Sequence, residues 1–213
     1  RFNLEELTRE LGERFETMGV ALKFYSCVGS NHTTLDAIRL MQDRHPFGAD
    51  DVEKFVIHGS QVTMDHVGWK YKPQGLTSAQ LNLPFCIATF MLEGDCFVEQ
   101  FPEDCVADPA RIAYADKVEV RHDAEITAKG SKFRHMVRAE VYLKDGTVLE
   151  ETVESARGSE KRFATTEQVV EKFEKLARHA IPEAQAAQLR DAVLGLEDLK
   201  DAGEIARRLV VQK

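Results

Sequence analysis

The stretch RAEVYLKDGTVLEETV, residues 138–153, decides the fold class. Apolar and polar residues alternate on both sides of Asp145-Gly146, which is typical of two antiparallel strands joined by a tight turn. Aspartate followed by glycine favours a two-residue turn, because such turns need backbone angles that these residues tolerate. The stretch therefore predicts a β-hairpin, with Asp145-Gly146 as its turn.

Three segments upstream of the hairpin are predicted to be further strands. KVEVRHD and VEKFVIHGS, residues 117–123 and 52–60, alternate between apolar and polar residues, and residues 19–27 form an apolar, strand-like run. Residues 62–75 mix aromatic, lysine, proline and glycine residues without a period, so we expect a long loop there. Together with the hairpin, these strands predict a mainly antiparallel sheet.

Helices are expected where apolar residues recur every three or four positions, as they do in residues 4–15 and 32–43. A third, strongly apolar helix is predicted over residues 78–92, with Gly94 just past its end. Pro84 lies inside it, so this helix either starts near Pro84 or kinks there. The apolar residues that define the first two helices are Leu4, Leu7, Leu11, Phe15, Leu35, Ile38 and Met41.

The character of the sequence changes at residues 155–164, after which the pattern is helical to the end. Thr165 or Thr166 can cap the first of these helices, and Pro182 can open the next. These patterns predict an α+β fold in which the terminal helices belong to a separate all-α group. The expected segments are a helical segment at residues 1–19, an α+β unit at 20–158 and C-terminal helices at 159–213.

Composition excludes several classes of partner for this chain of 213 residues. The net charge of −8 argues against nucleic acid, which needs a basic stripe. No apolar run approaches the roughly 18 residues of a membrane helix, and no signal peptide is visible, so we expect a cytoplasmic protein with no membrane partner. The charge balance leaves room for a small anionic ligand, which responds to local charge only.

Four cysteines are present, and no two of them form a C-x-x-C pair. In a protein without an export signal, reduced thiols are favoured over disulfides or a zinc site. Cys27 and Cys86 could border a cleft, although Cys86 follows Phe85 on an apolar helix and suits the core better.

The stretch ALKFYSCVGSNHTTLDAIRLM, residues 21–41, gathers groups that can bind an anion. Lys23 ends the predicted strand, and Ser30, Asn31 and His32 sit where the next helix begins. Free backbone N–H groups at a helix start favour an anion. Ordinary helix capping by the small polar residues explains the same letters, so both interpretations stand at this point.

Four stretches together resemble the MmgE/PrpD family, which includes 2-methylcitrate dehydratase, cis-aconitate decarboxylase and iminodisuccinate epimerase. LKFYSCVGSNHTTLDA is similar to the family's lysine-aromatic-proline segment, which runs on to a histidine and an Asp-Ala pair. AQLNLPFCIATFMLEGD is similar to its Ala-Gln-Phe-Ser-Leu-Pro-Tyr helix. DKVEVRHDAE and RGSEKRFATTEQVVEKF resemble the strand after its lid helices and its return to the helical domain.

The resemblance implies that the chain is the C-terminal part of a longer enzyme. The α+β unit would be a lid-type domain over an active site shared with a large helical domain. The family's other catalytic histidines lie upstream, so we expect this chain alone to be inactive. The resemblance also implies no metal or organic cofactor, and a homodimer formed through the helical domain. Ser26 stands where the family usually has proline, and Phe85 replaces its usual tyrosine, so the substrate can differ from those of named members.

The resemblance gives roles to six residues. Removing a proton α to a carboxylate builds negative charge, so this chemistry needs cations, hydrogen-bond donors and a base. Lys23 would supply a cation, or a base if buried, and His32 would be its catalytic partner or would hold it in place. The candidate substrate-binding residues are Ser30, Asn31, Lys70 and Lys72.

We therefore expect a lyase acting on a small di- or tricarboxylate, most simply a 2-methylcitrate dehydratase-like enzyme of propionate metabolism. Decarboxylation of cis-aconitate and epimerisation of iminodisuccinate start from similar carbanion-like chemistry, so both remain alternatives. A non-catalytic α+β module that binds a partner or a small acid is the alternative from another class.

Overall fold

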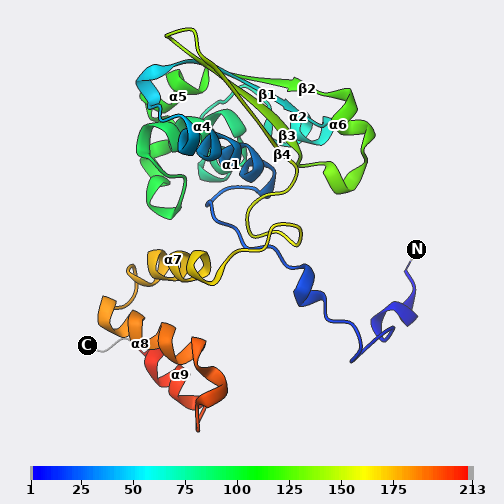
Figure 1. The fold of residues 1–213 in the computed structure, drawn as a ribbon, viewed down its shortest axis with the longest axis vertical. Coiled ribbons are helices and arrows are strands. Elements are labelled where there is room, and N and C mark those ends of the chain that lie inside the picture. The colour runs from blue at the N-terminus through cyan, green and yellow to red at the C-terminus, as the bar shows by residue number, and fades with distance from the viewer. Residues whose placement is uncertain (1, 211–213) are drawn as a thin grey trace. The chain divides into compact units, whose positions relative to one another are not determined.

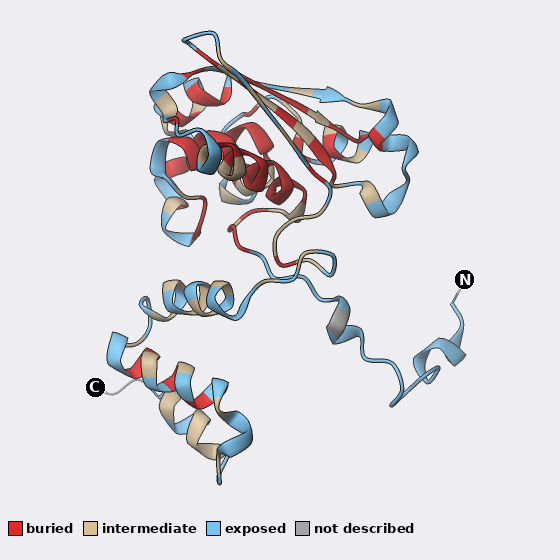
Figure 2. Ribbon diagram, viewed as in Figure 1, coloured by how far each residue is buried: buried red, intermediate tan, exposed pale blue. Residues whose placement is uncertain are grey.

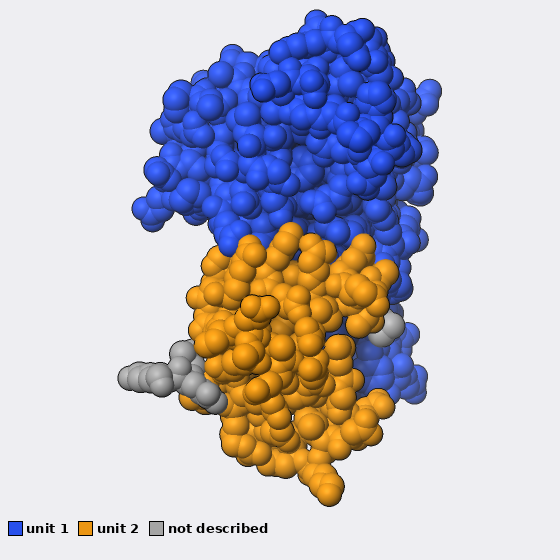
Figure 3. Space-filling view, turned by 60° about the vertical axis from the view of Figure 1, so that its left-hand side comes forward, with its two compact units in different colours: residues 1–163 blue, residues 164–213 orange. Residues whose placement is uncertain are grey.

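The computed structural model describes residues 2–210 and shows an α+β architecture (Figure 1). The described chain divides into two compact units, residues 1–163 and 164–213, coloured in Figure 3. Within residues 2–210, no helix combines the length and the apolar character needed to cross a bilayer. The assignment of both chain ends to one helical group stays a prediction.

The first unit contains a four-stranded sheet in the order β2-β1-β3-β4. Strand β1 pairs with β2 in parallel and with β3 antiparallel, and β3 and β4 form an antiparallel hairpin, so the sheet is mixed. The strands are β1 Val52–Gly59, β2 Val118–His122, β3 Val137–Leu143 and β4 Val148–Val153. The helices of this unit are α1 Gly29–Arg44, α2 Gln61–Val67, α3 Leu76–Leu81, α4 Leu83–Glu93, α5 Pro109–Ala115 and α6 Ala124–Ala128.

The hairpin is confirmed, but its turn is one residue longer than predicted. The Leu143 N–H donates to the Thr147 carbonyl at 2.8 Å, so Lys144, Asp145 and Gly146 form the loop. Only Gly146 takes a left-handed backbone, with φ of 90°. The predicted two-residue Asp-Gly turn, of type I′, needs positive φ at both residues, whereas the observed loop with a glycine bulge needs it at Gly146 alone.

Helices α1 and α4 cover one face of the sheet and form the core with it (Figures 1 and 2). The predicted apolar face of α1 is confirmed, because Leu35, Ile38 and Met41 are all at most 1% exposed. Along β3, buried residues alternate with half-buried ones, as the period of a strand requires. Burial of these side chains, at about 1.5–3 kcal/mol each, is the main term that stabilises this layer pair.

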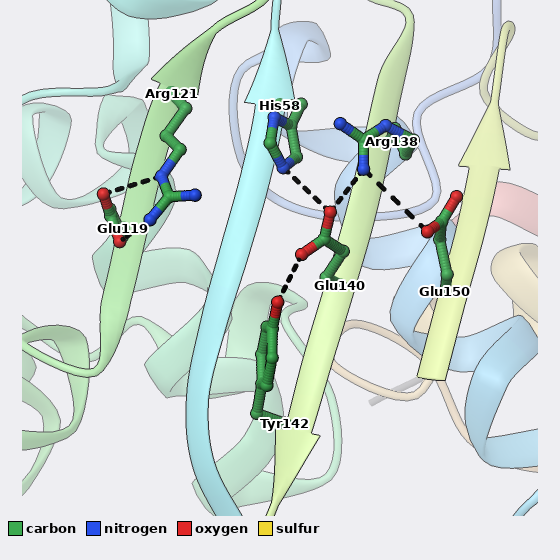
Figure 4. Close-up of polar contacts among 7 residues, drawn as sticks. All are labelled: His58, Glu119, Arg121, Arg138, Glu140, Tyr142 and Glu150. Carbon is green, nitrogen blue, oxygen red and sulfur yellow. Dashed lines mark hydrogen bonds and ion pairs between the residues drawn. The ribbon is translucent and has the colours of Figure 1, made fainter. Parts of the chain in front are cut away.

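The opposite face of the sheet carries a ladder of polar side chains (Figure 4). Glu140 is its centre: Oε1 lies 3.0 Å from Nε2 of His58, Oε2 accepts from the Tyr142 hydroxyl at 2.7 Å, and Arg138 pairs with the same carboxylate. The Tyr142 hydrogen bond, followed by Arg138 and His58, lowers the pKa of Glu140. The ladder identifies this face as the solvated side of the sheet.

Two predictions upstream of α1 were wrong. Residues 19–27 are not a strand, because the backbone N–H groups of Leu22, Ser26 and Val28 donate to Gly158, Cys96 and Gln80, which belong to three separate segments. Residues 4–15 contain a 3₁₀ turn, Leu4–Leu7, followed by turns at residues 8–13, and no α-helix. The apolar side chains that defined that helix are at least 67% exposed, and a helix this short needs packing to persist.

Two further predictions concern residues 61–94. The expected loop at 62–75 was wrong in its first half, where Ser60 caps α2 by accepting from the Thr63 N–H at 3.3 Å. The predicted helix at 78–92 is two helices, because Asn82 ends α3 and caps α4 through the Phe85 N–H at 2.8 Å. Of the two alternatives, the one in which a helix starts near Pro84 is therefore correct. Gly94, with φ of 77°, ends α4 as predicted.

The second unit is helical, as its sequence pattern predicts. Thr165 caps α7 together with Gln168, and Pro182 precedes α8. Its helices are α7 Thr166–Ala177, α8 Glu183–Leu194 and α9 Gly203–Leu209.

Candidate active site

A cleft of about 460 Å³ opens in the first unit and brings Lys23 and His32 together. It is bordered by residues 19–23, the start of α1, residues 131–135 and residues 154–161. Its charged and imidazole-bearing side chains are Lys23, His32, Lys132, Arg134, His135, Glu154, Arg157, Glu160 and Lys161. Lysine and arginine therefore outnumber the carboxylates in this cationic cleft, although the chain as a whole is acidic.

Helix α1 begins at Gly29, three residues earlier than expected. Val28 is the extended residue before the helix, and no side-chain hydrogen bond caps it, so the alternative interpretation of these polar residues as helix caps is wrong. Asn31 is fully buried, and its Nδ2 donates to the Gln80 carbonyl at 3.4 Å and to Sγ of Cys86 at 3.3 Å. Ser30 is also buried, and neither residue borders the cleft.

His32 lies in the first turn of α1 at the wall of the cleft. Its ring is 2% exposed and stands edge-on to Tyr25, with 5.2 Å between the centroids. Among the described residues, its Nε2 has no hydrogen-bond partner. This nitrogen is itself buried in the cleft wall, and an imidazole nitrogen without a partner is a group that can exchange a proton.

Lys23 is exposed at the opposite end of the same stretch and borders the cleft. Lys23 was expected to act as a base only if it were buried, and it is exposed. An exposed ammonium group can instead attract and stabilise negative charge. The hydrogen bond from the Leu22 N–H to the Gly158 carbonyl, 2.9 Å long, holds its backbone against the far wall.

Arg157 borders the cleft but was not among the residues predicted for the site. Its guanidinium carbon lies 4.2 Å from the ring centroid of Phe24, and its peptide N–H donates to Oδ2 of Asp36 at 2.7 Å. Stacking on an aromatic ring orients the planar guanidinium, which suits a carboxylate partner. In the sequence, residues 156–163 mark the domain boundary and part of the family resemblance, and only the fold brings them to α1.

Asp36 anchors that wall from the buried side of α1, where it is 3% exposed. It accepts hydrogen bonds from the Tyr25 hydroxyl at 2.9 Å and from Arg157, and Nη1 of Arg162 lies 3.2 Å away. Burial, and then the charge of Asp36, raises the pKa of Tyr25, so the hydroxyl remains a donor. Asp36 thus joins the segment before α1 to the loop that carries Arg157.

His135 adds a second imidazole to the cleft. Nε of Arg134 donates to its Nε2 at 3.0 Å, and the Thr33 hydroxyl on α1 donates to its backbone carbonyl at 2.6 Å. Burial lowers the pKa of His135 below 6.5, and the charges of Arg134, His66 and His32 lower it further.

This shift predicts an acid-sensitive fold. The unfolded chain binds a proton at His135 near pH 6.5, whereas the folded chain resists it until a lower pH. The stabilisation is therefore complete above about pH 6.5, the pKa in the unfolded chain, and it is lost as the pH falls through the lowered pKa of the folded chain. Chemical denaturation at successive pH values should show a smaller acid loss for His135→Gln than for the wild type. His45→Gln, at an exposed position, should keep the wild-type loss; equal curves for all three proteins would contradict the assignment.

Lys70 and Lys72 do not reach the cleft. Both are exposed, and Nζ of Lys70 lies 3.1 Å from the Asp116 carboxylate on the surface. The residues that border the cleft include neither. Their predicted role in substrate binding stays a prediction without support from this geometry, and Lys132 and Lys161 are the lysines placed to fill it.

Gly158 closes the contact between the cleft walls and has a positive φ of 83°. A β-carbon there would lie 2.6 Å from the Leu22 carbonyl oxygen and 2.8 Å from the Phe24 ring. Gly158→Ala should therefore destabilise the fold by about 2–3 kcal/mol, measured by chemical denaturation. Gly146→Ala is the matched control, since its φ of 90° is similar but nothing lies within 4 Å, and it should lose only about 1 kcal/mol. Equal losses would show that the contact with Leu22 is unimportant.

The described residues also contain one group of side chains suited to a metal ion. Sγ atoms of Cys27, Cys86 and Cys96 all lie within 4.8 Å of one another, and all three residues are buried. The sequence offered no sign of this cluster, because the three cysteines are widely and irregularly spaced.

Comparison with known proteins agrees with this architecture. The model of the MmgE/PrpD C-terminal domain matches residues 25–198. The chain is 25% identical over 214 residues to the cis-aconitate decarboxylase-like protein oryM of Aspergillus oryzae, across 96% of this chain and 43% of that protein. It is 26% identical over 206 residues to a cis-aconitate decarboxylase of Aspergillus terreus, across 92% of this chain and 42% of that protein.

The chain thus spans about two-fifths of the length of the curated relatives it matches. The resemblance seen in the four sequence stretches is confirmed, since the family match covers most of the α+β unit and continues into the helices after it. The chain belongs to the MmgE/PrpD family.

Proposed function

We propose that the cationic cleft is one wall of a lyase site for a small di- or tricarboxylate. The observation that carries the proposal is the gathering of Lys23, Arg157 and three further cations around two imidazoles in an acidic protein. Such a local field concentrates anions and selects among them by charge. In this proposal, the remaining groups of the site come from the rest of the complete protein.

Each cleft residue has a distinct role in the proposed reaction. The guanidinium of Arg157, stacked on Phe24, binds one substrate carboxylate through two parallel hydrogen bonds. Lys132 and Lys161 attract a distal carboxylate. Lys23 faces the reacting carbon and stabilises the negative charge that develops there.

His32 moves the proton. In a decarboxylation of cis-aconitate, the C–CO₂ bond at the CH₂ carbon breaks, its electron pair is delocalised through the neighbouring double bond to the carbon next to a remaining carboxylate, and the imidazolium of His32 protonates that carbon. In a dehydration, the neutral imidazole of His32 removes a proton next to a carboxylate, and the hydroxide that leaves the neighbouring carbon takes that proton from the imidazolium and departs as water. Both routes build charge α to a carboxylate, which is why one cleft can serve either.

Decarboxylation of cis-aconitate is the first reaction to test, because the relatives named above are cis-aconitate decarboxylase and a protein like it. Dehydration of 2-methylcitrate, within propionate metabolism, is the second candidate and rests on the family resemblance of the cleft segments. The proposal includes a homodimer formed through the helical parts of the complete protein.

The deciding experiment incubates the complete protein with cis-aconitate, 2-methylcitrate, citrate and iminodisuccinate in deuterated water. Proton NMR follows product formation and deuterium incorporation next to a carboxylate. Turnover of one of these acids, with deuterium in the product, supports the lyase. Saturable binding without turnover or exchange would instead support the non-catalytic module, and neither binding nor turnover would remove the proposal.

A further inference from the structure

Three buried thiols converge beside the candidate active site, although they come from three different segments. Cys27 lies two residues before α1, Cys86 lies within α4, and Cys96 follows that helix. They are 5%, 0% and 0% exposed, and their Sγ atoms lie within 4.8 Å of one another. The fourth cysteine, Cys105, is buried but does not belong to the cluster.

Hydrogen bonds lock the segments that carry these thiols. The Ser26 N–H donates to the Cys96 carbonyl at 2.9 Å, which ties the residue before Cys27 to Cys96 itself. Gln80, in the helix before α4, accepts from the Val28 N–H at 3.1 Å and donates from Nε2 to the Ser26 carbonyl at 2.9 Å. The cluster is therefore held by the backbone on both sides of Cys27, which is the preorganisation that a metal site needs.

The convergence of three thiols at one point suits a bound ion better than a disulfide. A disulfide needs an S–S distance of about 2.05 Å and would leave the third thiol unused. Zinc–thiolate bonds of about 2.3 Å in a tetrahedral arrangement place sulfur atoms about 3.8 Å apart. The three sulfur atoms, all within 4.8 Å of one another, lie close to that spacing.

Two features of the site stabilise the negative charge that three thiolates would bring. Cys27 lies at the N-terminal end of the 16-residue helix α1, where the helix dipole favours an anion. Nδ2 of Asn31 donates to Sγ of Cys86 at 3.3 Å, a hydrogen bond of the kind that supports metal-bound thiolates.

We propose that Cys27, Cys86 and Cys96 form a buried binding site for a thiophilic cation of the zinc(II) class. On binding, each thiol releases its proton to solvent and forms one metal–sulfur bond. The metal has a structural role in this proposal: it fixes the start of α1, from which His32 reaches the cleft. The inference goes beyond the proposed function and makes no use of any substrate.

The test measures metal content in the complete protein, produced in zinc-supplemented medium and desalted under reducing conditions. About one zinc per chain is expected for the wild type and for the matched control Cys105→Ser. Cys86→Ser and Cys96→Ser should each retain about tenfold less. Circular dichroism establishes that every variant is folded.

A second measurement does not depend on any variant. Cobalt(II) added to the reduced, metal-free wild type should produce thiolate-to-cobalt charge-transfer absorption, which zinc(II) then removes. Absence of that absorption together with negligible retained zinc would overturn the proposal. So would a thiol count of two instead of four in the unreduced, denatured wild type, because it would show a disulfide. None of these outcomes bears on the lyase proposal, which is tested with substrates.

Discussion

Lys23→Ala is expected to lower kcat/KM of the complete protein on its active substrate by at least about 10²-fold. In the proposed site, Lys23 is the cation nearest the developing charge, and losing such a group costs more in the transition state than in the ground state. Because Lys23 is exposed and contributes little to the core, unfolding of the variant should match that of the wild type. Steady-state kinetics and thermal unfolding measure the two quantities.

The companion variants separate charge from geometry. Lys23→Arg should restore little activity, because a guanidinium keeps the charge but places it differently. Lys144→Ala, in the exposed hairpin turn, removes an equal charge away from the cleft and should leave turnover near normal. Near-normal turnover for Lys23→Ala would mean that Lys23 is only a solvated turn residue.

Asp36→Ala is expected to give the largest stability loss on this wall, about 3 kcal/mol in the free energy of unfolding. The change leaves the buried Tyr25 hydroxyl and the Arg157 N–H without their acceptor, and removes the carboxylate that faces Arg162. The loop that carries Arg157 should also loosen, so KM should rise together with the loss of stability. Chemical denaturation and steady-state kinetics test both effects.

Two controls distinguish Asp36 from other acidic residues of the helix. Asp43→Ala removes an exposed carboxylate two turns further along α1 and should change stability by less than about 0.5 kcal/mol. Asp36→Asn keeps one carbonyl acceptor and should lose less than Asp36→Ala. If Asp36→Ala and Asp43→Ala behaved alike, Asp36 could not be the anchor of the cleft wall.

Local patterns predicted the parts of the fold that depend on nearby residues. The hairpin follows from the alternation of its own letters, and the buried face of α1 follows from its helical period. The strand predicted at residues 19–27 was wrong because the hydrogen bonds of this segment go to three distant segments. An apolar run alone does not distinguish such a segment from a strand.

The candidate site likewise contains residues that a local pattern predicts and one that only the fold reveals. Lys23 and His32 share one short stretch, so their arrival at one cleft could be expected from the sequence and the family resemblance. Arg157 depends on the contact of its loop with Asp36, more than 100 positions away, and no pattern in the sequence encodes that contact. Lys70 and Lys72 were predicted from their charge, which suits an anion, but the fold places their segment away from the cleft.

The pairing of β1 sets the order in which this unit can fold. Strands β3 and β4 are adjacent in the chain and can associate within microseconds as a hairpin. The central strand β1 finds its neighbours only at Val118–His122 and Val137–Leu143, so two large loops must close before its ladders form. During synthesis, the apolar residues Phe55, Val56 and Ile57 therefore cannot have both of their partner strands until residue 143 has left the ribosome. Refolding should accordingly be slow, on the millisecond-to-second scale of sheets built from distant strands.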